Sequence, residues 1–104
     1  MVKKLLKKLS SFEKSEYSDN KYTSENSFGY INIEKIRGKT WEISNISINI
    51  DLRKKGYGKK LIKHTFKFMK KQGATGVLLN SPVEEATGFW NKMGFRDVNK
   101  RMKL

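Results

Sequence analysis

The segment 56–72 has the periodicity of an amphipathic helix, and it constrains the fold more than any other part of the sequence. Its apolar residues recur three and four positions apart, and lysines occupy the opposite face. Apolar runs typical of strands precede it at 40–50 and follow it at 76–80. This order predicts a right-handed βαβ unit and therefore an α/β fold. The apolar face comprises Leu61, Ile62, Thr65, Phe66, Phe68 and Met69, and the lysine face Lys59, Lys60, Lys63, Lys67, Lys70 and Lys71.

The strand at 40–50 changes the parity of its apolar positions. Trp41 and Ile43 are odd-numbered, whereas the isoleucines from Ile46 onward are even-numbered. Because successive strand residues face opposite sides of a sheet, one inserted residue is needed to keep all of them on the core side. We therefore predict a β-bulge near Ser44-Asn45, which would leave backbone groups free for a ligand.

The remaining segments predict short elements around this unit. A strand at 28–36 and the turn Arg37-Gly38-Lys39 form a hairpin with the bulged strand. The spacing of apolar residues predicts a basic amphipathic helix over 2–13, packed on the domain or lying on a membrane or RNA. Polar residues 14–27 predict a loop with at most a short strand. Gly73 predicts the end of the long helix, and a second helix over 83–93 and short strands at 95–98 and 101–104 follow.

The composition restricts the chemistry. The sequence has no cysteine, which excludes disulfides and thiolate chemistry, and its single histidine, His64, indicates that no metal site is present. A length of 104 residues predicts one domain, 1–104, with an N-terminal helix and loop over 1–27 and a core over 28–104. No apolar run approaches the roughly 20 residues of a membrane span, and we expect a cytoplasmic protein.

The charge is strongly positive. The formal net charge is +13, from 23 basic and 10 acidic residues, and such a field attracts polyanions. The partner could be a nucleic acid, an anionic membrane, an acidic protein or a phosphate-rich cofactor, and a lysine-rich surface also keeps a small domain soluble. Charge alone does not separate these interpretations.

A glycine-rich basic segment lies between the bulged strand and the long helix. It reads Arg53-Lys54-Lys55-Gly56-Tyr57-Gly58. The first turn of a helix has unpaired N–H groups and a partial positive charge, and glycines let an anion approach them. The segment fits neither the Walker pattern nor the Rossmann fingerprint. It predicts a binding site for a pyrophosphate.

Two segments resemble motifs of the GCN5-related N-acetyltransferase (GNAT) family. The family motif Arg/Gln-x-x-Gly-x-Gly/Ala is matched by Arg53, Gly56 and Gly58. The motif Ala-x-x-x-Tyr-x-x-x-Gly-Phe is matched by 86–95, with Trp90 in place of the tyrosine. The resemblance covers 28–104. It implies a GNAT-like mixed central sheet with helices on both faces, truncated at the N-terminus.

The resemblance implies acetyl-CoA as co-substrate. In the family the bulged strand hydrogen-bonds the pantetheine arm, the glycine loop holds the pyrophosphate, and the end of the next strand lies near the thiol. The cofactor-binding residues expected here are Ile46, Ser47, Ile48, Arg53, Lys54, Lys55, Gly56, Tyr57, Gly58, Lys59, Asn80, Phe89 and Trp90.

The resemblance also implies direct acetyl transfer to a primary amine, with Glu42 as the base. Glu42 lies eleven residues before Arg53, where many family members carry a glutamate; it could equally be a strand glutamate paired with a lysine. Trp90 cannot protonate the departing thiolate, so Ser81, Tyr57 or water would have to do so. Trp90 is otherwise expected to pack beside Phe89 and Phe95.

The acceptor and the assembly stay open. The acceptor is a small molecule or a protein amine, and a short chain implies a shallow groove, completed by a partner or by a second copy in a homodimer. Two other functions compete with catalysis. One is a non-catalytic acyl-CoA-binding protein, suggested by Trp90, and the other is a nucleic-acid-binding module that uses the lysines of 59–71.

Overall fold

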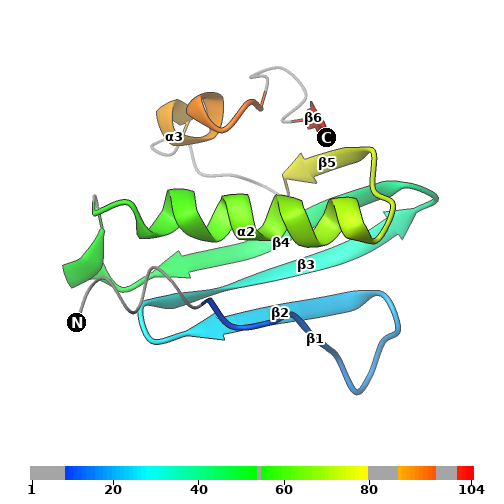
Figure 1. Ribbon diagram of the computed structural model, residues 1–104, viewed down its shortest axis with the longest axis horizontal. Helices are drawn as coiled ribbons and strands as arrows, with labels where there is room; N and C mark the ends of the chain where they lie inside the picture. The colour runs from blue at the N-terminus through cyan, green and yellow to red at the C-terminus, as the bar shows by residue number, and fades with distance from the viewer. Residues whose placement is uncertain (1–8, 54, 80–86, 96–100) are drawn as a thin grey trace.

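The protein folds around a six-stranded mixed sheet. A computed structural model describes residues 9–53, 55–79, 87–95 and 101–104. The strands follow one another in the sheet in chain order, β1 to β6 (Figure 1). Their bounds are β1 Glu13–Lys14, β2 Lys21–Asn26, β3 Gly29–Arg37, β4 Thr40–Ile48, β5 Gly76–Leu79 and β6 Arg101–Lys103. The helices are α2 Tyr57–Lys71 and α3 Thr87–Lys92, and a short 3-10 turn spans Ile50–Leu52.

The predicted βαβ unit is confirmed. β4 pairs with β5 in parallel, and α2 connects them, while all other neighbouring strands are antiparallel. The α/β class and the mixed sheet are therefore as expected. Gly73, in the left-handed region at φ 89°, follows the end of α2 as predicted.

The predicted bulge is present in β4. Asn32 is paired with Asn45 and Ile33 with Ile43, so Ser44 is the extra residue on β4. The insertion brings the isoleucines on either side of it toward the same core: Ile43 is buried, and Ile46 and Ile48 pack against the core cluster. A second shift lies near the hairpin turn, where Ile36 is the extra residue on β3.

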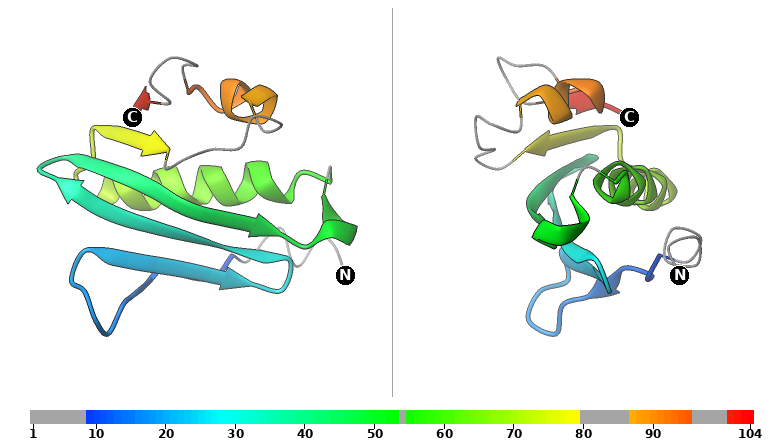
Figure 2. Two further views of the ribbon diagram at one scale, coloured as in Figure 1. Left: turned by 180° about the vertical axis from the view of Figure 1, so that it is seen from behind. Right: turned by 90° about the vertical axis from the view of Figure 1, so that its left-hand side faces the viewer.

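The core lies between the sheet and α2. Ile31, Ile33, Trp41, Ile43 and Val77 from the sheet are buried together with Leu61, Ile62 and Met69 from α2. The predicted inner face of the helix is thus confirmed, with Phe66 and Phe68 partly buried at its margins. The end-on view in Figure 2 shows α2 lying along one side of the sheet.

The second helix joins the same core. Trp90 of α3 is 6% exposed, and Phe66 of α2 lies 6.1 Å from Phe95, between ring centroids. We expected helices on both faces of the sheet; within the described residues, α2 and α3 meet on one side of it. Residues 83–86 of the expected second helix and 96–98 of the expected strand lie outside the described residues, and Phe95 is not in a strand.

The N-terminal prediction is corrected in its second half. Residues 9–12 form no helix, and Glu13 pairs with Thr23 in a strand. The cause is tertiary packing, because the Phe12 ring stacks on Phe68 at 4.6 Å and on His64 at 5.4 Å. Residues 1–8 lie outside the described residues. The expected loop at 14–27 contains a six-residue strand, β2. Neither of the described helices has the length and apolar character needed to cross a bilayer.

Candidate coenzyme A site

The strand β4 has an edge that β5 leaves unpaired. Among the described residues, the parallel pairing runs from Thr40↔Gly76 to Ile43↔Leu79, next to the bulge at Ser44. From Ser44 to Ile48, β4 pairs only with β3 among the described strands. Among the described strands, this edge of β4 beyond Ile43 has no partner, and the residues that follow Leu79 lie outside the described part of the chain.

The orientation of the β4 backbone along this edge follows from one hydrogen bond. The Asn49 N–H donates to the Phe28 carbonyl at 2.7 Å, so the backbone of Asn49 faces β3. Backbone groups of successive strand residues point to opposite edges. The groups of Ser47 therefore face β3, whereas those of Ile46 and Ile48 point to this edge. Sequence reasoning placed Ser47 at the site with the two isoleucines; only the isoleucines present backbone groups there.

This edge of β4 leads to the start of α2. Gly56 is the N-cap of α2, with φ 88° and ψ 0°, and it provides no side-chain cap. The first N–H groups of a helix have no partner within the helix, and they carry a partial positive charge. A Cβ built on Gly56 would meet nothing within 4 Å, and Gly56 itself is exposed. Lys55 and Lys59 beside it are exposed, and Lys54 lies outside the described residues.

Arg53 connects the end of β4 to this loop. Its Nε–H donates to the Ile48 carbonyl at 2.9 Å. The bond uses one of the five N–H donors of the guanidinium, which leaves the terminal ones for an anion. It also occupies the carbonyl of Ile48, so the Ile48 N–H and both backbone groups of Ile46 are what the strand offers to a ligand.

The two aromatic residues of the second motif, Phe89 and Trp90, have different surroundings. The Phe89 ring borders the helix start, 3.4 Å from the position of a Cβ on Gly58. Trp90 packs edge-on against Phe89, at 4.9 Å, and against Phe95, at 5.4 Å, between ring centroids. Trp90 is therefore a core residue, as the packing alternative predicted, and Phe89 is the one that reaches the loop.

Tyr57 also belongs to the core. Its side chain is 1% exposed and its ring stacks on Phe28 at 4.7 Å. The hydroxyl is buried with no hydrogen-bond partner in the described part of the chain. Its place away from solvent argues against the role of proton donor that we considered for it. Asn80 and Ser81, the other residues expected near the thiol end, lie outside the described residues.

Glu42 lies on the opposite face of the sheet from α2. Its neighbours in β4, Trp41 and Ile43, are buried in the core, so the half-buried carboxylate of Glu42 points to the open face. The Ser44 hydroxyl lies 3.5 Å from Glu42 Oε1. Among the described residues Glu42 has no ion pair, and the lysine pairing that we considered is not formed. Sequence reasoning missed Glu34, which lies directly opposite Glu42.

Comparison with known proteins decides the family. The model of the acetyltransferase (GNAT) family matches residues 10–95. The chain belongs to this family. In this GNAT protein the bulged strand β4 precedes Gly56 and α2 in the chain order that the motif predicted. No protein with a curated description matches the sequence significantly.

Solved acetyltransferase structures share the fold. An acetyltransferase from Thermus thermophilus superposes with a TM-score of 0.74 at 15% identity, over 86% of this chain and 68% of that chain. An acetyltransferase from Bacillus subtilis in complex with CoA superposes with a TM-score of 0.67 at 25% identity, over 86% and 77%. The GNAT acetyltransferase from Desulfovibrio desulfuricans has a TM-score of 0.66 at 13% identity; the match covers 75% of this chain but 57% of that longer protein.

The helix α2 of this GNAT domain carries a row of positive charge. The six lysines of its outer face are all exposed, and the first turn contains no acidic residue. The part of the chain that the structure describes contains no group of three or more His, Asp or Glu side chains placed to hold a metal ion.

Proposed function

We propose that the protein transfers an acetyl group from acetyl-CoA to a primary amine by direct attack, without a covalent enzyme intermediate. One observation carries the proposal: the edge of β4 that has no partner among the described strands leads from the bulge near Glu42 to the start of α2, whose N-cap Gly56 provides no side-chain cap. A linear ligand with amide groups in its middle and a diphosphate at one end matches this sequence of backbone groups.

The proposed binding roles follow the geometry. The Ile48 N–H and the backbone groups of Ile46 hydrogen-bond the pantetheine amides. The N–H groups at the start of α2 and the terminal nitrogens of Arg53 hold the pyrophosphate, because an anion is favoured at a helix N-terminus. Gly56 and Gly58 keep that space free of side chains, and Phe89 forms its apolar border.

In the proposed chemistry, Glu42 is the base that accepts the proton of the acceptor amine. The bound thioester supplies an activated carbonyl, whose C–S bond breaks as the new C–N bond forms. Glu42 accepts a proton from the amine, directly or through water, which aids the reaction by roughly 10²–10⁴. Such a base is needed because an alkylamine has a pKa of about 10.4 and is mostly protonated at neutral pH. Because a thiol has a pKa of about 8.5, the release of an unprotonated thiolate at neutral pH costs little free energy, and water suffices to protonate it.

The first test is binding. Calorimetry of the protein with coenzyme A at low ionic strength should give a saturable heat, and acetyl-CoA should raise the melting temperature, because ligand bound only to the native state stabilises it. Gly58→Trp should abolish both effects, since Phe89 and Ile48 leave no room for an indole beside the loop. Release of thiol from acetyl-CoA with amine acceptors tests turnover, and the absence of cysteine removes any background from the protein.

One observation favours a second function, the binding of acyl-CoA without turnover. Trp90 replaces the tyrosine of the motif and is buried between Phe89 and Phe95, so it supplies no acid at the site. Coenzyme A binding with no thiol release across a panel of amines would favour this function. The nucleic-acid alternative predicts instead that RNA or DNA shifts melting, steeply dependent on salt, while coenzyme A does not.

A further inference from the structure

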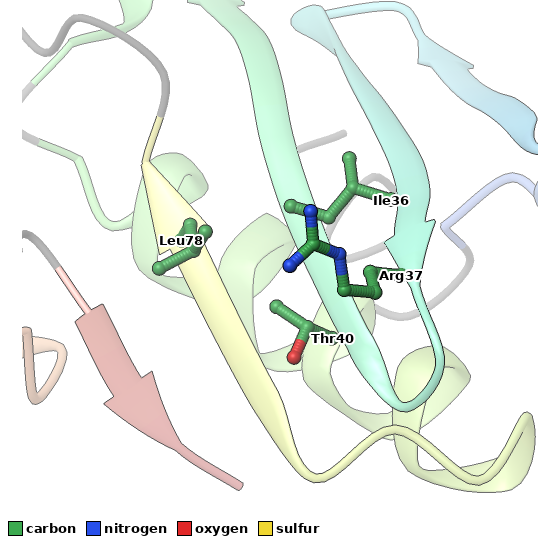
Figure 3. A pocket seen from close by; sticks show the side chains of 4 residues that line it. All are labelled: Ile36, Arg37, Thr40 and Leu78. Atoms are coloured by element: carbon green, nitrogen blue, oxygen red, sulfur yellow. The ribbon is translucent and has the colours of Figure 1, made fainter.

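A cavity of about 310 Å³ opens on the face of the sheet opposite α2. Ile36 and Arg37 at the end of β3, Thr40 at the start of β4 and Leu78 of β5 line it. Figure 3 shows the Arg37 guanidinium in front of β4, between the side chains of Ile36 and Thr40. Nothing in the family motifs involves these residues, and they lie near Glu42.

The bulge at Ile36 creates this cavity. Lys35 is paired with Trp41 and Arg37 with Thr40, so Ile36 is inserted between them. Without the insertion, alternation would direct Ile36 and Arg37 to opposite faces of the sheet. The extra residue turns both toward the face of Thr40. An apolar side chain and a guanidinium therefore line the same hollow.

The charges of this face are separated along the strands. Arg37 is exposed and has no ion pair or hydrogen bond among the described residues. Two residues further along β4 from Thr40, the carboxylates of Glu42 and Glu34 lie side by side across the strands. At a rise of about 3.4 Å per residue, the backbone of Glu42 lies about 7 Å along β4 from that of Thr40, the partner of Arg37. Leu78, which lines the cavity, is paired with Glu42 in the register.

We infer that this face binds an acceptor with a primary amine at one end and a carboxylate at the other, joined by an apolar chain. The ammonium group lies at Glu34 and Glu42, the apolar chain against Ile36 and Leu78, and the carboxylate at Arg37. The inference rests on the proposed function, because Glu42 is its base. It adds a substrate class, an ω-amino acid or a compound of that shape.

The test compares two acceptors of equal chain length. 6-Aminohexanoate carries an amine and a carboxylate separated by five methylenes, whereas hexylamine lacks the carboxylate. Thiol release from acetyl-CoA gives kcat/KM for each. We expect 6-aminohexanoate to be preferred, and the preference to fall about tenfold in Arg37→Gln, as for a lost charge-assisted hydrogen bond. Lys39→Gln removes the same charge from the same turn, outside the cavity lining, and should leave the preference unchanged.

A binding measurement separates this inference from the proposed function. Calorimetry of 6-aminohexanoate with the protein saturated with coenzyme A requires no turnover. Binding that Arg37→Gln weakens about tenfold, even with no acetylation, supports the inference while the proposed function fails. Acetylation of both acceptors with a preference insensitive to Arg37→Gln overturns the inference and leaves the proposed function standing. The absence of both binding and acetylation overturns both.

Discussion

Glu34 lies directly opposite Glu42 across β3 and β4, on the open face of the sheet. Like charges at directly opposed positions destabilise an antiparallel pair. A two-residue turn without the bulge would have placed Lys35 opposite Glu42 and formed an ion pair. The insertion of Ile36 moves Lys35 to the core side and leaves two carboxylates together, an arrangement that a bound ammonium group would stabilise.

Glu42→Gln should reduce kcat by roughly 10²–10⁴, because the amide cannot accept the proton of the amine. The effect is read from thiol release at saturating acetyl-CoA. Glu34→Gln is the matched variant, with the same change on the same face. We expect it to raise the KM for the amine acceptor more than it lowers kcat. Equal losses of kcat in the two variants would contradict the assignment of the base to Glu42.

Glu34→Lys should stabilise the free protein while weakening acceptor binding. An opposite-charge pair in place of two carboxylates contributes about 0.2–1 kcal/mol across strands. Urea unfolding without ligand measures this gain. The KM for the amine should rise, since the lysine would occupy the place of the substrate ammonium. A loss of stability would show that Glu34 and Glu42 do not repel each other.

Gly56→Ala and Gly73→Ala form a matched pair at the two ends of α2. Both glycines adopt a positive φ, 88° and 89°, and neither has an atom within 4 Å of an added Cβ. Each variant should lose stability by about 1–2 kcal/mol through backbone strain. Only Gly56→Ala should also weaken coenzyme A binding, because its methyl group enters the space before the helix amides. Calorimetry of both variants against coenzyme A distinguishes the two effects.

Arg53→Lys should weaken coenzyme A binding about tenfold, although the charge is kept. A lysine cannot donate from a planar fork to the Ile48 carbonyl and to a phosphate at the same time. Arg37→Lys makes the same exchange at the far end of β3 and should leave the coenzyme A affinity unaltered. An unchanged affinity of Arg53→Lys for coenzyme A would show that Arg53 stabilises the loop and does not contact the ligand.

Trp90→Tyr and Trp90→Phe test the proton donor. Both remove part of the buried indole that packs on Phe89 and Phe95, and both should lower the melting temperature. Only tyrosine adds a hydroxyl. We expect equal kcat in the two variants, because residue 90 lies in the core and water protonates the thiolate. A higher kcat in Trp90→Tyr than in Trp90→Phe would contradict this and would show that a hydroxyl at position 90 reaches the thiolate.

The sequence predicted a structural feature correctly where the spacing of apolar residues requires one particular backbone geometry. The bulge at Ser44 was predicted because isoleucines on both sides of it must reach one core. The bulge at Ile36 was not, because the neighbouring Arg37 is compatible with either face and gives no parity signal. The pairing of Glu34 with Glu42 was missed for the same reason, because the insertion of Ile36 decides which residue lies opposite Glu34.

The N-terminal segment shows the opposite failure, in which local periodicity was overridden. Leu9 and Phe12 have helical spacing, yet they pack on the core from a segment that is not helical. The strand β2 is polar in sequence, and its one fully buried side chain, Ser24, donates to the Ser10 carbonyl at 2.8 Å. Such a strand is specified by partners distant in sequence, which periodicity does not record.

Because of the hydrogen bond between Arg53 and the Ile48 carbonyl, the binding free energies of the nucleotide and pantetheine halves of the proposed ligand should depend on each other. A nucleotide fragment that reorients the guanidinium would release that carbonyl, and a pantetheine fragment that competes for the carbonyl would release the guanidinium. The binding free energies of the fragments should therefore not sum to that of intact coenzyme A, and the deviation should disappear when residue 53 can no longer make the bond.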